Sequence, residues 1–266
     1  MGRLQDKRLF LLDMDGTIYL DDRLFDGVIP FLTRIREKGG RYIFLTNNSS
    51  RGVESYMEKL AGMGIATTRE DYLTSVDAAI DRLRRDYPGK RCYVQGTRSF
   101  YDQLVAAGIP VTCDREDGAD ILLSGFDREL TFQKLEDACI LLNRGVVWLA
   151  TNPDWVCPTW YGSVPDCGSV CRMLTTATGR QPVFLGKPQP DMARLALART
   201  GFPPDEAVLI GDRLYTDIAC AVNAGIDSVF VLSGEGRRGD IERDKIYPTW
   251  VYNDIAAVFR AWEETP

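Results

Sequence analysis

The sequence predicts an α/β fold in which a parallel-sheet core carries a second, inserted α/β domain. Short apolar runs alternate with amphipathic stretches of helical spacing, which is the pattern of parallel βα units. The runs are almost entirely apolar, as expected for strands that helices cover on both faces. The chain has 266 residues, of which 45% are hydrophobic and 26% charged. This length accommodates one large domain or two of medium size.

Five apolar runs are the expected strands of the core, and helical segments follow several of them. Val53–Leu60 is one such helix, and two glycines follow it. Met192–Arg199 comes after a proline, which favours the first turn of a helix, and Asp217–Asn223 ends just before a glycine. These elements predict a core built from residues 1–78 and 183–266. The expected strands are Leu9–Leu12, Tyr42–Leu45, Val183–Leu185, Val208–Ile210 and Val229–Leu232.

Residues 79–182 have alternating elements of their own and are expected to form the inserted domain. Their apolar runs bracket two helical stretches, Phe100–Ala107 and Phe132–Asn143. About 100 residues are enough for a separate domain. Acidic and basic residues are nearly equal in number there, so the insert is close to neutral. The expected strands of the insert are Cys92–Val94, Ile121–Leu123 and Val146–Ala150.

Composition excludes several classes of function. The chain has 32 Lys and Arg against 38 Asp and Glu, a formal charge of −6, which disfavours nucleic acid and anionic membranes as partners. No apolar run approaches the roughly 18–20 residues that cross a bilayer. The N-terminus lacks the pattern of a signal peptide, so a cytoplasmic protein is expected. The absence of histidine excludes imidazole-based catalytic triads and His-ligated zinc. The seven cysteines form no C-x-x-C pair and are expected to be incidental thiols.

Two carboxylates follow the first expected strand. Asp13 and Asp15 enter a turn that contains Gly16 and Thr17, and such residues also occur in ordinary polar turns. The functional interpretation makes Asp13 a nucleophile and Asp15 a general acid/base. A hard cation nearby would suppress the repulsion between the two carboxylates.

Two further strand ends carry groups that suit a phosphate. Thr46 and Asn47 follow the second strand, where they would cap the next helix or offer a hydroxyl and backbone N–H groups to an anion. Lys187 follows the run at Val183–Leu185, and its ammonium group would neutralise a phosphoryl oxygen. A surface turn is the alternative interpretation for Lys187.

A second acid pair, Asp212 and Asp217, follows the strand Val208–Ile210. One interpretation is an acidic helix start that favours the helix dipole. The other makes Asp212 a magnesium ligand that Asp217 supports through water or through Lys187. All four loops lie at the carboxyl ends of expected parallel strands, where open α/β sheets gather their ligands. Together they supply a nucleophile, phosphate-binding groups, a cation and metal ligands.

The motifs DMDGT, LTNNS, GKPQP and GDRLYTDI resemble, in this order, the four motifs of the haloacid dehalogenase superfamily of phosphohydrolases. The resemblance runs over nearly the whole chain and favours the branch of NagD-like and 4-nitrophenylphosphatase-like proteins. It includes the insert, where Gly125–Arg128 and Ala150–Asp154 look like cap-domain signatures of that branch. The segment Pro165–Ser169 departs from the usual Gly- or Ala-rich turn by carrying Cys167.

The resemblance implies a Rossmann-like core with an inserted cap and a magnesium-dependent phosphatase that forms an aspartyl-phosphate. Magnesium would be held by an Asp13 oxygen, the Asp15 backbone carbonyl, Asp212 and waters. The phosphoryl oxygens would be held by Thr46, the Asn47 amide and Lys187. A phosphomutase and a phospho-accepting signalling module are the alternatives, and the latter needs neither Asp15 nor a 100-residue insert. A dehalogenase and an inactive binding protein fit the motifs less well.

The near-neutral insert favours a small metabolite phosphate over a macromolecule as substrate, for example a nucleoside monophosphate or a sugar phosphate. Trp155 and Trp160 are expected in a proline-flanked loop, where they could stack on the leaving group of the substrate. Asn152 and Asp154 could add polar contacts beside them. The oligomeric state is open, with a homodimer as one option.

Overall fold

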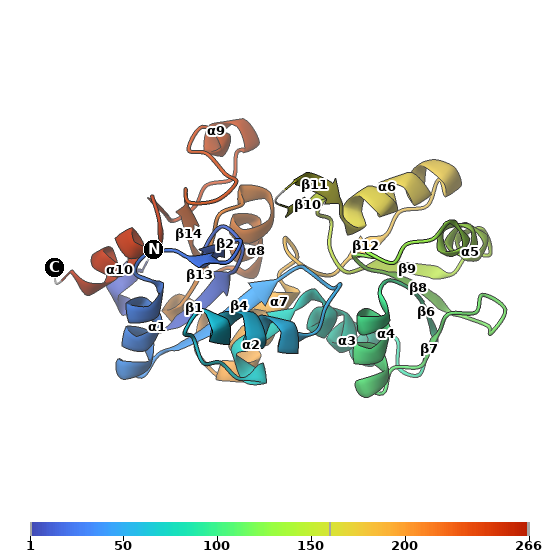
Figure 1. Cartoon of the computed structure of the whole chain (residues 1–266), viewed down its shortest axis with the longest axis horizontal. Coiled ribbons are helices and arrows are strands. Elements are labelled where there is room, and N and C mark those ends of the chain that lie inside the picture. The colour runs from blue at the N-terminus through green and yellow to red at the C-terminus, as the bar shows by residue number, and fades with distance from the viewer. Residues whose placement is uncertain (1, 160, 265–266) are drawn as a thin grey trace. The chain divides into compact units, whose positions relative to one another are not determined.

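A computed structural model of the chain describes residues 2–159 and 161–264 (Figure 1). The chain divides into two compact units. Unit 1 comprises Met1–Thr46, Val53–Leu73 and Lys187–Pro266, and unit 2 comprises Asn47–Gly52 and Thr74–Gly186. The sequence placed the limits of the insert at residues 79 and 182. Every helix in the described ranges is too short or too polar to cross a lipid bilayer.

Unit 1 is built around a six-stranded sheet in the order β15-β14-β13-β1-β4-β5. The pairs on both sides of β1 and β14 are parallel, so the carboxyl ends of these strands lie along one edge. Apolar side chains fill the central strands because helices cover them. The strands are β1 (Leu9–Asp13), β4 (Arg41–Thr46), β5 (Tyr72–Thr74), β13 (Ala207–Gly211), β14 (Asp227–Val231) and β15 (Trp250–Tyr252).

Aromatic packing attaches two helices to one face of this sheet. The ring of Phe10 in β1 lies 5.2 Å from that of Phe31 in α1 and 5.0 Å from that of Trp262 in α10, both edge to face. Such pairs stabilise beyond the area that they bury. The helices of unit 1 are α1 (Val28–Glu37), α2 (Val53–Gly62), α7 (Asp191–Thr200), α8 (Ala219–Ala224), α9 (Asp240–Asp244) and α10 (Ile255–Glu263), and a short hairpin joins β2 (Tyr19–Leu20) to β3 (Arg23–Leu24).

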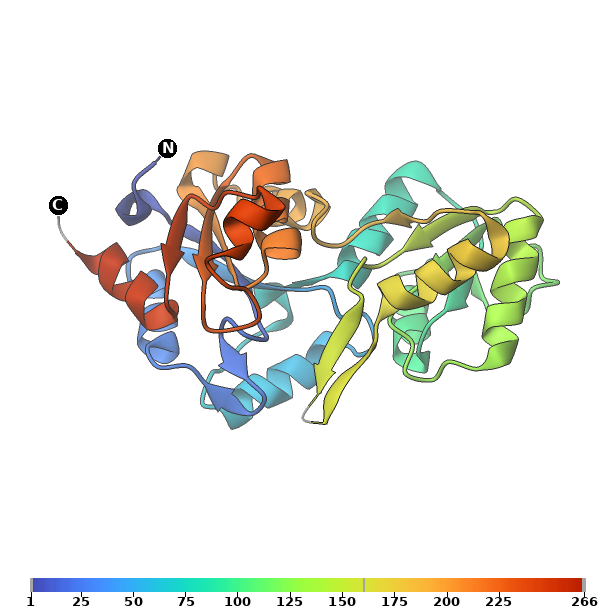
Figure 2. The ribbon, with the colours of Figure 1, turned by 90° about the horizontal axis from the view of Figure 1, so that it is seen from above.

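Unit 2 contains a parallel five-stranded sheet in the order β12-β9-β8-β6-β7. Helices α3 (Ser75–Asp86) and α4 (Arg98–Ala106) cover one face, and α5 (Phe132–Asn143) and α6 (Cys167–Thr178) cover the other (Figure 1). The strands are β6 (Cys92–Gln95), β7 (Val111–Thr112), β8 (Ile121–Ser124), β9 (Val147–Ala150) and β12 (Val183–Phe184). An antiparallel hairpin of β10 (Val156–Thr159) and β11 (Gly162–Pro165) projects from this unit (Figure 2).

The structure confirms the predicted fold class, a Rossmann-like parallel-sheet core with an inserted α/β unit, but two local predictions are wrong and a third is confirmed only in part. Val183–Leu185 does not supply a strand to the core, because β12 pairs with β9 in unit 2. The segment after Trp155 is a hairpin rather than a loop, since Val156–Thr159 pairs with Gly162–Pro165. The helix expected at Asp217–Asn223 is divided into a π-helix, Leu214–Ile218, and α8.

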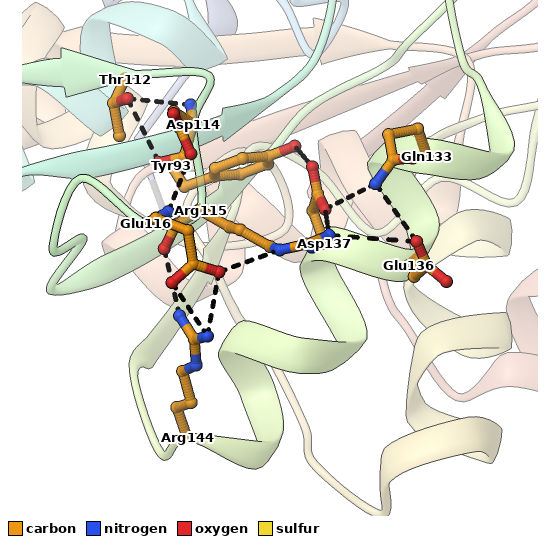
Figure 3. Close-up of polar contacts among 9 residues, drawn as sticks. All are labelled: Tyr93, Thr112, Asp114, Arg115, Glu116, Gln133, Glu136, Asp137 and Arg144. Atoms are coloured by element: carbon orange, nitrogen blue, oxygen red, sulfur yellow. Dashed lines mark hydrogen bonds and ion pairs between the residues drawn. The ribbon is translucent and has the colours of Figure 1, made fainter.

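A polar network stabilises unit 2 around the buried carboxylate of Asp137 in α5 (Figure 3). Its oxygens accept hydrogen bonds from the Tyr93 hydroxyl at 3.0 Å, from Arg115 at 2.6 Å and from Gln133 at 2.9 Å. Burial by itself raises the pKa of Asp137, but these three donors outweigh burial and the pKa is lowered. The network therefore stabilises the ionised form of Asp137.

We expect Asp137→Ala to lower the free energy of unfolding by about 1–3 kcal/mol, because Tyr93 and Arg115 lose a charged acceptor. The loss should be seen in urea unfolding above about pH 4 and should shrink as the pH falls through the lowered pKa of Asp137. Glu136→Ala on the same helix is the control, since the Glu136 carboxylate is exposed and lies 3.9 Å from Arg115. Equal losses in the two variants would contradict a structural role for the network.

Candidate active site

Three carboxylates converge at the carboxyl edge of the unit 1 sheet. Asp13 ends β1, and Asp212 directly follows the neighbouring parallel strand β13. Asp217 lies in the π-helix Leu214–Ile218 that comes after β13, and π-helical turns are frequent at functional sites. Each of the three residues offers a carboxylate oxygen, and these oxygens lie within 4.8 Å of one another. The sheet therefore collects acids that are up to 204 residues apart in the sequence.

Lys187 joins two of these acids by ion pairs, of which the pair with Asp217 is buried and the pair with Asp13 partly buried. Its Nζ atom donates to Asp13 Oδ1 at 2.5 Å and to Asp217 Oδ1 at 2.6 Å. Only 2% of Lys187 is exposed. Burial lowers the pKa of Lys187, but the charges of Asp13 and Asp217 more than offset it, so the pKa is raised. Lys187 therefore stays protonated and presents a fixed positive charge beside Asp13.

The negative charge of the three carboxylates exceeds the positive charge of Lys187. Burial raises the pKa of Asp13 well above its usual range, and the charge of Asp217 raises it further, against the opposing effect of Lys187. Burial and then Asp217 raise the pKa of Asp212 to about 6. The raised pKa values mean that burial and like charge disfavour the ionised carboxylates, and three carboxylates against one ammonium leave an excess of negative charge. A cation at this edge would offset it.

The Asp212 carboxylate has one anchored oxygen and one oxygen with no hydrogen bond. Oδ2 accepts from the backbone N–H of Glu235 at 2.7 Å. Oδ1 is buried, and no group in the described part of the chain hydrogen-bonds to it. A buried carboxylate oxygen without a partner is costly, which fits a metal ligand. Oxygen donors from three carboxylates suit a hard cation such as Mg²⁺ or Ca²⁺.

Glycines allow the backbone to approach Asp212 closely. A Cβ atom on Gly16 would lie 2.5 Å from Asp212 Oδ2, and one on Gly234 would lie 1.9 Å from the same oxygen. Gly16 also has a φ of 87°, in the left-handed region that favours glycine. Sequence reasoning did not identify the loop Ser233–Glu235 after β14, which packs on Asp212 and donates to it. Its position at the carboxyl end of a predicted strand was the available signal.

Thr46 and Asp15 flank the cluster in different environments. Thr46 ends β4, next to Leu45, whose carbonyl oxygen lies 3.4 Å from Lys187 Nζ. The Thr46 side chain is almost fully buried, whereas Asp15 is exposed in the turn after β1. The Asp15 side chain does not belong to the carboxylate group formed by Asp13, Asp212 and Asp217. An exposed carboxyl group can exchange protons with solvent.

The remaining residues that the sequence singled out belong to unit 2. Asn47 donates from Nδ2 to Asp154 Oδ2 at 2.8 Å, and Asn152 donates to the same oxygen at 2.8 Å. Asn152 and Asp154 are buried, while Trp155 is 54% exposed just before β10. Trp160 lies outside the described residues. Unit 2 thus brings Asn47, Asn152 and Asp154 together.

Comparison with known proteins identifies related sequences and folds along the whole chain. Residues 10–110 match a family described as haloacid dehalogenase-like hydrolase, and residues 184–258 match a HAD-hydrolase-like family. The acid sugar phosphatase of Staphylococcus aureus is 30% identical over 252 residues, which cover 95% of this chain and 96% of that protein.

Two solved structures extend this similarity. The 4-nitrophenylphosphatase of Thermotoga maritima is 38% identical with a TM-score of 0.92, covering 98% of this chain and 99% of that one. The glycerol phosphate phosphatase of Mycobacterium tuberculosis, solved in complex with magnesium, is 31% identical with a TM-score of 0.90. That match covers 97% of this chain and 78% of the other.

Proposed function

We infer that this chain is a magnesium-dependent phosphatase of small metabolites. The inference starts from its membership of the haloacid dehalogenase-like hydrolases, by which it hydrolyses phosphate monoesters. The observation that carries the proposal is the buried cluster of Asp13, Asp212, Asp217 and Lys187. It combines a carboxylate nucleophile, a fixed ammonium group and an acidic pocket for a cation.

Asp13 acts as the nucleophile in this proposal. One of its oxygens attacks phosphorus, and the bond from phosphorus to the leaving oxygen breaks, which leaves an aspartyl-phosphate. Lys187 Nζ, already 2.5 Å from Asp13 Oδ1, is placed to neutralise charge on the phosphoryl oxygens. Thr46 and the backbone amide of Asn47 are proposed to hold the same oxygens.

Asp15 moves the protons. It donates a proton to the leaving oxygen in the first step and then removes one from the water that attacks phosphorus. This second attack breaks the bond between Asp13 and phosphorus and releases inorganic phosphate. The exposure of Asp15 supports a proton-transfer role, since its carboxyl group reaches solvent.

The metal is proposed to bind an Asp13 oxygen, Asp212 Oδ1 and the backbone carbonyl of Asp15, with Asp217 in support. Magnesium would supply positive charge that permits a dianionic phosphate to approach the carboxylates. The bare Oδ1 of Asp212 supports this assignment, and so does the name of the magnesium-bound glycerol phosphate phosphatase among the similar structures.

The substrate is proposed to be a small phosphate monoester, such as a sugar phosphate, a nucleoside monophosphate or a related metabolite. The names of the acid sugar phosphatase and the glycerol phosphate phosphatase support this class. We propose the insert at residues 79–182 as a cap that selects the leaving group. Trp155 offers an exposed ring for stacking, and specificity roles are also proposed for Trp160 and Asn152.

The test is a measurement of phosphate release from a panel of metabolite monophosphates and 4-nitrophenyl phosphate with magnesium present. We expect turnover of 4-nitrophenyl phosphate and of a subset of small metabolites. Trp155→Ala should raise KM for the preferred metabolite by roughly 3- to 30-fold, since it removes a stacking surface, and should spare 4-nitrophenyl phosphate. Phosphate that stays on the protein would indicate a signalling module, and an isomeric sugar phosphate product would indicate a phosphomutase.

A further inference from the structure

The chain passes between the two units at several points. Residues of unit 2 that lie at or next to three of these points contact one another. Asn47 follows Thr46, Ser75 lies just after the passage at residues 73 and 74, and Gly186 precedes Lys187. The Ser75 hydroxyl donates to the Asn47 carbonyl oxygen at 2.7 Å. The Gly186 N–H donates to the Thr151 carbonyl oxygen at 2.7 Å. Thr151 therefore lies at the junction of these segments.

Gly186 fits this junction without spare room. A Cβ atom at Gly186 would lie 2.5 Å from the Thr151 carbonyl oxygen and 2.6 Å from Asn47 Oδ1. Contacts this short do not occur for real Cβ atoms, so backbone or side chain would have to shift. The residues next to Thr46 and to Lys187 are thus packed against each other. A displacement of Asn47 would therefore displace Gly186, and the reverse.

Asp154 fixes the Asn47 side chain at this junction. One carboxylate oxygen, Oδ2, accepts from both Asn47 Nδ2 and Asn152 Nδ2, each at 2.8 Å. Asn152 is oriented in turn by the Thr151 hydroxyl, which donates to its Oδ1 at 2.8 Å. Asp154 is 3% exposed and Asn152 is fully buried. Buried, charge-assisted hydrogen bonds of this kind hold side chains in one geometry.

We propose that Asp154 is a positioning residue for catalysis, which acts through Asn47 and Gly186 on the placement of Thr46 and Lys187. Each of these two phosphate-binding residues is one peptide bond from a residue that the junction fixes. The inference rests on the proposed function, because it assigns Thr46 and Lys187 to the phosphoryl group. In this inference Asp154 does not contact the substrate; it controls the position of the groups that bind the phosphate.

The experiment compares three variants and one control in the full chain with magnesium. Asp154→Ala removes the acceptor, whereas Asp154→Asn can place its carbonyl oxygen where Oδ2 lies and accept both hydrogen bonds. Gly186→Ala disturbs the junction from the opposite side. Gly62→Ala is the matched control, since a Cβ atom there meets nothing within 4 Å. The readouts are kcat and KM for 4-nitrophenyl phosphate and for the preferred metabolite, inhibition by inorganic phosphate, and Tm.

We expect Asp154→Ala and Gly186→Ala to lower kcat by about 10- to 100-fold for both substrates, because small misplacement of catalytic groups is costly. Inhibition by inorganic phosphate should weaken in the same variants. Asp154→Asn should keep kcat within about 5-fold of the wild type, as should Gly62→Ala. If Asp154→Ala fails to fold, the kcat values of Gly186→Ala and Asp154→Asn relative to the wild type test the proposal by themselves.

Two results would overturn the proposal. A change in KM for the metabolite alone, with 4-nitrophenyl phosphate and inorganic phosphate unaffected, would make Asp154 a substrate contact. A lower Tm with unchanged kcat would leave Asp154 and Gly186 with a purely structural role. Failure of the proposed function is distinguishable, because the wild-type protein itself would then release no phosphate.

Discussion

Asp13→Asn is expected to reduce turnover by roughly four or more orders of magnitude, since loss of a covalent nucleophile removes the reaction path. An amide has nearly the shape of a carboxylate but is a very poor nucleophile. The asparagine can still accept the hydrogen bond that Lys187 Nζ donates to Oδ1. Fold and substrate binding should therefore survive, and Tm should rise or stay the same as one buried negative charge is removed.

The measurement is a steady-state assay of phosphate release from 4-nitrophenyl phosphate, with Tm recorded for each protein. Asp227→Asn is a suitable control, because this acid pairs with Lys7 at 2.6 Å away from the carboxylate cluster. The control should retain activity within a few-fold while its stability falls. Wild-type rates in Asp13→Asn would rule out Asp13 as the nucleophile.

Removal of the metal is expected to have an effect of similar size. Chelation with excess EDTA should abolish phosphate release, because Asp13, Asp212 and Asp217 would repel a dianionic substrate and the single charge of Lys187 would not balance theirs. Added magnesium should restore the activity. Full activity after exhaustive chelation would contradict the proposed metal site.

Metal binding should also depend on pH in a defined direction. The pKa of Asp212 is raised to about 6, so protons compete with the metal below that pH. The stabilisation of the protein by magnesium, measured as a Tm shift, should therefore grow between pH 5 and pH 7, roughly across the pKa of Asp212. In the metal-free protein the sign is opposite, because a raised carboxyl pKa favours folding at low pH and this contribution is lost as the pH rises through about 6.

The sequence predicts the acidic edge of the sheet well, because the prediction depends only on residues that are adjacent in the chain. An acid at or just after the end of an apolar strand lies at the carboxyl edge, as do Asp13, which ends β1, and Asp212, which follows β13. The rule needs no knowledge of which strands are neighbours. Parallel pairing of β1 with β13 then brings the two acids together.

Other features depend on pairing or on backbone groups, which leave no pattern in the sequence. The run at Val183–Leu185 is apolar like a core strand, but only the register with β9 shows that it belongs to unit 2. The donor to Asp212 is the backbone N–H of Glu235, which any residue could supply. The two hydrogen bonds that the Asn47 and Asn152 amides donate to the buried Asp154 carboxylate likewise follow from the tertiary structure.

The central claim is that Asp13 becomes phosphorylated during each turnover. The most direct measurement is acid quenching of the protein during steady-state turnover, followed by borohydride reduction, which converts an aspartyl-phosphate to homoserine, and by peptide mass spectrometry. The account predicts homoserine at position 13, dependent on both substrate and magnesium. Active protein with no reduced residue at position 13, or with the reduced residue at Asp212 instead, would contradict it.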